Sequence, residues 1–173
     1  MTNKSANSNI IAAIFRRRMG NARKTRLFHD LPQTERQLLL EHARLEPGEA
    51  PIIAYLGGDT SWCLVTNRGL VWLDAEGVQH LSIFDVDRFT HDMGAALQRG
   101  HLDKRQFHEL TIHMKSGETA LIQLEAGAAF YGVWRALDWM LDWANRPEQA
   151  ADPGPPGRVT GNRARTAHQQ SQS

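Results

Sequence analysis

From residue 52 to residue 124 the chain repeats short apolar segments divided by turn residues, and this rhythm limits the fold more than any other feature. In the clearest segment Leu110, Ile112 and Met114 alternate with polar residues, which is the two-residue period of a strand with one buried face. Such segments, joined mostly by hairpin-length links, predict an antiparallel meander that bends into a barrel or a sandwich. The seven predicted strands are Ile52–Leu56, Ser61–Thr66, Leu70–Leu73, Val78–Phe84, Val86–Thr90, Phe107–Met114 and Thr119–Leu124.

A helical pattern precedes the strands. Pro32 suits the first turn of a helix, which is predicted to run to about Arg44. Its buried stripe is expected at Leu38, Leu39 and Leu45.

The stretch Gly127–Arg146 predicts the last helix, because its apolar residues recur every three or four positions and so share one face. Trp134 stands in the middle of that face and is expected to be buried. The face comprises Phe130, Val133, Trp134, Leu137, Leu141 and Ala144. The predicted fold is therefore α+β, with a leading helix, seven antiparallel strands and a C-terminal helix that caps one end.

Charge divides the chain into three parts. Residues 1–30 carry seven Lys and Arg against Asp30 alone, a net charge of +6, whereas residues 31–146 carry ten basic and sixteen acidic residues, a net charge of −6. We expect a basic, partly disordered arm at 1–30, a domain at 31–146, and a disordered tail rich in Pro, Gly and Gln at 147–173. A basic arm beside an acidic body either binds an anionic partner or folds back on the body.

The arm also contains a short helical pattern. Ile10, Ile11, Ile14 and Phe15 share one side, which is typical of a helix that lies on a membrane surface or binds a partner. The alternative is a mobile tail. The candidate residues for binding an anionic surface are Arg16, Arg17, Arg18, Arg23, Lys24 and Arg26, with Ile14 and Phe15 supplying the apolar insertion.

Two phrases of the sequence resemble the bacterial pleckstrin-homology-like domains. Trp62–Trp72, which reads WCLVTNRGLVW, is similar to the strand, Thr-Asn turn and strand of that family, and Leu45–Glu49 is similar to its entry into the first strand. The resemblance covers about Pro32 to Arg146. It implies seven strands in two nearly orthogonal sheets, with a C-terminal helix in one open end. Gly69 departs from the pattern, since a second basic residue is common there.

The sequence contains no grouping of residues that matches a known catalytic motif. The chain has no Gly-rich phosphate loop, no Cys-x-x-Cys and no His-Glu-x-x-His. Cys63, the only cysteine, lies in an apolar segment and is expected to be a small buried residue. Asp85 and Asp87 alternate with apolar residues, as surface residues of a strand do. We therefore expect no catalytic residues, no cofactor and no enzyme.

Four histidines were weighed as zinc ligands, because they lie in or near the long link Met93–Arg105. They are His91, His101, His108 and His113. No close pair shares a helix face, so solvated histidines are the expected outcome and no metal site is predicted.

Trp139 and Trp143 are four residues apart on the predicted last helix, opposite the Phe130–Ala144 face. Arg135 and Arg146 flank them. Two exposed indoles would form a docking patch for a partner, and the alternative is that the leading helix or the arm covers them.

These features favour a cytoplasmic, non-enzymatic binding or scaffold module that engages a protein partner or self-associates through its helix and sheet edge. A single cysteine fits a reducing compartment, and no apolar stretch reaches the ~18 to 20 residues of a membrane span. The alternative is a peripheral membrane module that uses the basic arm on anionic lipid. Nucleic-acid binding by the Arg-rich ends ranks third.

Overall fold

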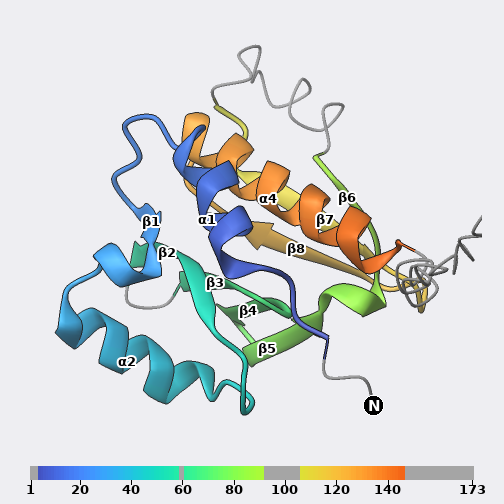
Figure 1. Cartoon of the computed structure of the whole chain (residues 1–173), viewed down its shortest axis with the longest axis horizontal. Helices are drawn as coiled ribbons and strands as arrows, with labels where there is room; N and C mark the ends of the chain where they lie inside the picture. The colour runs from blue at the N-terminus through green and yellow to red at the C-terminus, as the bar shows by residue number, and fades with distance from the viewer. Residues whose placement is uncertain (1–3, 59–60, 92–105, 147–173) are drawn as a thin grey trace, which may run out of the picture.

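The computed structural model describes residues 4–58, 61–91 and 106–146, and its strands form two antiparallel sheets (Figure 1). The five-stranded sheet has the order β1-β2-β3-β4-β5, and the three-stranded sheet the order β6-β7-β8. All seven predicted strands are confirmed, and the sheets do not close into a barrel. The strands are β1 (Thr25–Leu27), β2 (Pro51–Gly58), β3 (Ser61–Thr66), β4 (Gly69–Asp74), β5 (Gly77–Ser82), β6 (Val86–Thr90), β7 (Glu109–Met114) and β8 (Thr119–Gln123).

One face of the five-stranded sheet is covered by α2 (Gln33–Ala43). Leu39 and Ala43, four residues apart on one side of α2, pack with Ala54, Leu64 and Val71 of the sheet. Burial of Leu38 was predicted and is wrong, because this side chain lies one residue off that side and is 57% exposed.

The main core lies between the other face of this sheet, the three-stranded sheet and α4 (Ala128–Ala144). Phe130 and Leu137 of α4 and Leu110 and Ile112 of β7 are fully buried there. The predicted C-terminal helix is therefore confirmed, and it closes the main core.

Trp134 is half-buried, so its predicted place at the centre of the α4 core face is wrong. The buried side of α4 instead includes Gly132 and Ala136, because a second helix packs there. Trp134 stands at the border of the buried side, where its ring lies 4.4 Å from that of His91.

The second helix is α1 (Ser8–Arg16), which lies along α4 (Figure 1). Its Ile11 and Phe15 side chains are fully buried in the main core. Further along the arm, β1 pairs with β2 and places Leu27 in the same core. The expected boundary at Leu31 therefore does not separate the arm from the domain: the described residues of the arm are part of the same folded unit.

The short 3-10 helices η1 (Phe28–Asp30) and η2 (Ile83–Asp85) complete the described elements. The predicted tail at 147–173 and His101 lie outside the described residues.

Candidate functional site

The arm helix turns its apolar side inward. Phe15 packs against Gly132 of α4, and Ile14 is half-buried against the main core. Ile10, which is 42% exposed, is the exception. The expected membrane insertion of Ile14 and Phe15 does not fit this arrangement, because the apolar area they would insert is already buried against α4.

The cationic side of the arm faces outward. Six side chains are exposed, and no salt bridge of theirs occurs within the described ranges. The last residue of α1, the loop after it and β1 supply them. We call this set the basic surface: Arg16, Arg17, Arg18, Arg23, Lys24 and Arg26.

Glu125 holds the loop that carries the basic surface. Its Oε1 accepts a hydrogen bond from the backbone N–H of Arg23 (2.7 Å), and its Oε2 accepts from those of Lys24 (2.9 Å) and Thr25 (2.7 Å). Gly20, earlier in the loop, lies so close to Ala128 that an added Cβ would be 2.9 Å from the Ala128 Cβ. The basic surface is thus fixed beside the start of α4.

The protonation of Glu125 reflects this binding. Partial burial acts to raise the pKa of the Glu125 carboxyl, but hydrogen bonding by Arg23, Thr25 and Lys24 outweighs burial and holds the pKa below its usual value. The carboxylate is therefore charged at neutral pH and directed at backbone donors. The negative charge of Glu125 therefore stabilises hydrogen bonds within the fold.

The tryptophan patch is largely occupied by the chain itself. Trp139 and Trp143 are half-buried against the main core, and the Trp143 ring lies 5.8 Å from that of Phe84. Arg135 and Arg146 are exposed, and Arg135 lies 3.7 Å from Asp138. The structure therefore does not bring these residues together as an open docking patch.

Burial raises the pKa of the Asp138 carboxyl, against the lowering effects of Arg135 and of the Trp134 indole N–H. That N–H is buried and completes no hydrogen bond of standard geometry. The Trp134 N–H is therefore shielded from water, whereas the Asp138 side chain remains 33% exposed.

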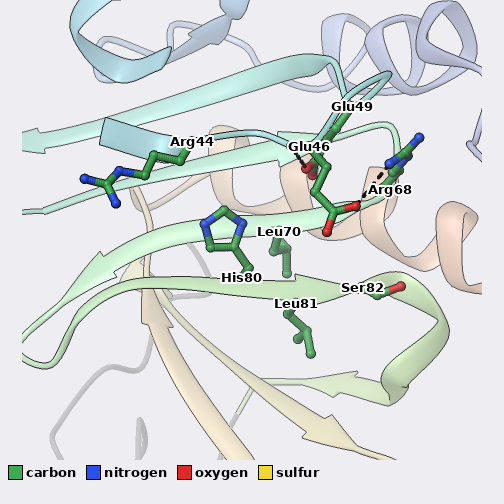
Figure 2. Close-up of a pocket in the computed structure, with 8 residues that line it drawn as sticks. All are labelled: Arg44, Glu46, Glu49, Arg68, Leu70, His80, Leu81 and Ser82. Carbon is green, nitrogen blue, oxygen red and sulfur yellow. Dashed lines mark hydrogen bonds and ion pairs between the residues drawn. The ribbon is translucent and has the colours of Figure 1, made fainter. Parts of the chain in front are cut away.

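A cavity of about 470 Å³ lies between the α2 end and strands β4 and β5 (Figure 2). Figure 2 shows the Arg68 and Glu46 side chains directed toward each other, while the Arg44 side chain extends away from them. Arg68 pairs with Glu46 (3.3 Å) and donates to the carbonyl of Pro47 (3.0 Å). Because its charge is already paired, Arg68 is a weak candidate for ligand binding. The lining residues are Arg44, Glu46, Glu49, Arg68, Leu70, His80, Leu81 and Ser82.

The two phrases that carry the family resemblance are bonded to each other beside this cavity. The Thr66 hydroxyl donates to Glu49 Oε1 (2.6 Å), Asn67 Oδ1 accepts from the N–H of Ala50 (2.8 Å), and Asn67 Nδ2 donates to the carbonyl of Gly48 (3.2 Å). Thr66 and Asn67 are buried. The side chains of Thr66 and Asn67 hold the connections between β2, β3 and β4 in place. Their role in the fold therefore accounts for these two residue types.

Cys63 is buried in β3, and burial raises the pKa of its thiol to about 12. Such a thiol is protonated at neutral pH and cannot act as a nucleophile. The described histidines have separate partners: His113 Nε2 lies 2.8 Å from Thr90 Oγ1, and His108 Nδ1 lies 2.9 Å from the carbonyl oxygen of Gln106. In residues 4–58, 61–91 and 106–146, no three His, Cys, Asp or Glu residues are grouped so that they could hold a metal ion.

In the part of the chain that the structure describes, no helix combines the length and the apolar character needed to span a membrane.

The chain was compared with protein-family models, curated proteins and solved structures. None of them matches it. Among the candidate sites in the described part of the chain, the basic surface has exposed functional groups that form no salt bridge with described residues.

Proposed function

We propose that this protein is a non-enzymatic binding module that attaches to an anionic membrane surface through its basic surface. The observation that carries the proposal is the exposure of all six cations, free of salt bridges to described residues, on the end of α1, on β1 and on the loop between them, which Glu125 fixes. A fixed loop loses little conformational entropy on binding, so more of the Coulomb attraction appears as affinity.

Lipid is favoured over a small anion because the cations are spread as exposed side chains over the end of α1, the loop after it and β1. Each Lys or Arg held near an anionic bilayer contributes about 1 kcal/mol. Binding would be electrostatic, without the insertion of Ile14 and Phe15.

The order of elements also supports, as part of this proposal, a relationship to the pleckstrin-homology-like fold. After α2, four strands of one sheet are followed by three of another and then by the closing helix α4. β1 is an addition at the edge of the first sheet. In this proposal the module's binding surface is formed by β1, by the end of α1 and by the loop between them.

The test is sedimentation of the full chain with vesicles of phosphatidylserine and phosphatidylcholine. Replacing Arg16, Arg17 and Arg18 by Ser should weaken binding about a hundredfold, since three cations contribute about 3 kcal/mol. Binding by the unchanged protein should fall as salt rises, because the Debye length shrinks from about 8 Å at 0.15 M to about 3 Å at 1 M.

The matched control replaces three exposed cations elsewhere, Lys115, Arg135 and Arg146, by Ser. This variant should bind nearly as well as the unchanged protein. Equal losses in both variants would mean that only total charge matters. Binding to a single-stranded oligonucleotide, with none to the vesicles, would replace lipid by nucleic acid as the partner.

A further inference from the structure

Strand β8 has an unpaired side. It is the last strand of the order β6-β7-β8, and within residues 4–58, 61–91 and 106–146 it pairs only with β7. The N–H of Met114 donates to the carbonyl of Glu118, and that of Leu124 donates to the carbonyl of His108, so even-numbered residues of this strand direct their backbone groups toward β7. By alternation, the backbone groups of Thr119, Leu121 and Gln123 point to the open side.

This edge lacks the devices that keep strands from pairing between molecules. Native edges are shortened, bulged or supplied with charged residues or proline. Here β1 has three residues and an exposed Arg26, and β6 has a register shift and exposed Asp87 and Arg88. β8 reads Thr-Ala-Leu-Ile-Gln, with neither charge nor proline, and it pairs with β7 without a register shift.

An exposed leucine stands at the centre of the edge. Leu121 is 56% exposed. Beside it lies a hollow of about 630 Å³ whose apolar walls include Trp62, Trp72 and Leu73. An apolar side chain from a partner that pairs with β8 would therefore find apolar surface on both sides.

We propose that β8 pairs with β8 of a second copy of this chain, antiparallel about a twofold axis at Leu121. In this register Leu121 faces its counterpart, and Thr119 faces Gln123 on both sides of the axis. Glu118 then faces Leu124, so no like charges oppose each other. The strand is self-complementary in the way an isologous dimer interface requires.

The two three-stranded sheets would join into one continuous sheet across the dimer. The Leu121 side chains would shield each other and the apolar hollows from water. This inference does not depend on the proposed membrane function, because its tests contain no lipid.

The first test is sedimentation equilibrium of the full chain over a wide range of concentration. The unchanged protein should approach twice the monomer mass as its concentration rises. Leu121→Lys should remain a monomer over the same range with an unchanged melting temperature. The control is His80→Lys on β5, an edge strand of the five-stranded sheet that likewise has no charge, proline or register shift, and it should dimerise normally.

A protein that is a monomer throughout would overturn the proposal. So would a dimer that survives Leu121→Lys, or one that His80→Lys abolishes, since either result would place the interface elsewhere.

The second test fixes the register by disulfide formation. Facing residues of an antiparallel hydrogen-bonded pair have Cα atoms about 5.5 Å apart, within the range of a disulfide. Leu121→Cys should therefore form a linked dimer on mild oxidation. Thr119→Cys should link to Gln123→Cys in a mixture of the two variants and should link poorly to itself. Cys63 is buried and should not interfere. Efficient linking of Thr119→Cys to itself would contradict the register.

Discussion

The aromatic ring of Phe15 lies against Gly132, so close that a Cβ added at Gly132 would come within 2.9 Å of the ring. The absence of a side chain at Gly132 thus lets α1 approach α4. Gly132→Ala, which normally favours a helix by about 1 kcal/mol, should here destabilise the protein by about 1 to 3 kcal/mol through overpacking. Urea unfolding would measure the change.

A compensating substitution separates this clash from a general effect of alanine. Phe15→Leu shortens the ring that Gly132→Ala would meet, so the double variant should lose less stability than the two single variants combined. Additive losses would show that the two residues do not interact.

The burial of Phe15 makes a separate prediction about the arm. Phe15→Ala should cost about 3 to 5 kcal/mol, because the side chain is fully buried. Ile10→Ala, on the exposed side of the same helix, should change stability by no more than about 0.5 kcal/mol. Equal effects in urea unfolding would mean that α1 does not pack on α4 in solution.

Glu125 predicts an acid-sensitive part of the stability. Glu125→Gln should destabilise the protein at neutral pH by about 1 to 3 kcal/mol, because one carboxylate serves three backbone donors. The folded pKa is lower than the ordinary 4.5, so this contribution is present above pH 4.5 and is lost as the pH falls through the folded value. Melting curves of the two proteins should converge in acid, and a constant difference would contradict the prediction.

Gly69 has no room for a side chain at the start of β4. An added Cβ would lie 1.9 Å from the carbonyl oxygen of Leu81 in β5, and both groups belong to rigid backbone. Gly69→Ala should therefore cost more than about 4 kcal/mol, the range of severe core disruption. Gly117→Ala is a useful comparison: its Cβ would meet open space, although its backbone φ of +92° is strained for alanine. Thermal melting should show a smaller loss of stability for Gly117→Ala than for Gly69→Ala.

Cys63 should be inert in the folded protein. With a thiol pKa of about 12, little thiolate exists at pH 8, and the side chain is buried. Iodoacetamide should modify it only as fast as the protein opens, and added urea should accelerate the reaction. Rapid modification of the native protein would contradict the burial of this residue.

The strands and two of the helices could be predicted because their signals are local. Alternation marks β7, and three-to-four spacing marks α4. β1 was missed since three residues are too few to show a period. Gly69 lies just before the predicted strand Leu70–Leu73, whereas the structure places it in β4, where close approach to Leu81 explains it.

The candidate site was likewise predictable only where its signals are local in the sequence. The sequence identified every cation of the basic surface, but not the acceptor that fixes their loop, because Glu125 is about a hundred residues away. The partner of α1 was equally remote. A signal for it was present: Gly132 and Ala136, two small residues one turn apart, permit close helix packing.

The distance between the arm and Glu125 also orders events during synthesis. The arm leaves the ribosome first, yet Thr25 binds a residue 100 positions later, and Phe15 packs on a helix that begins later still. Ile11 and Phe15 can contact β2 once that strand is made, but they cannot reach full burial before α4 is made. A nascent chain stalled before α4 would display the apolar side of α1 together with its arginines. The same segment therefore exposes apolar side chains early in the life of the molecule and is a core element afterwards.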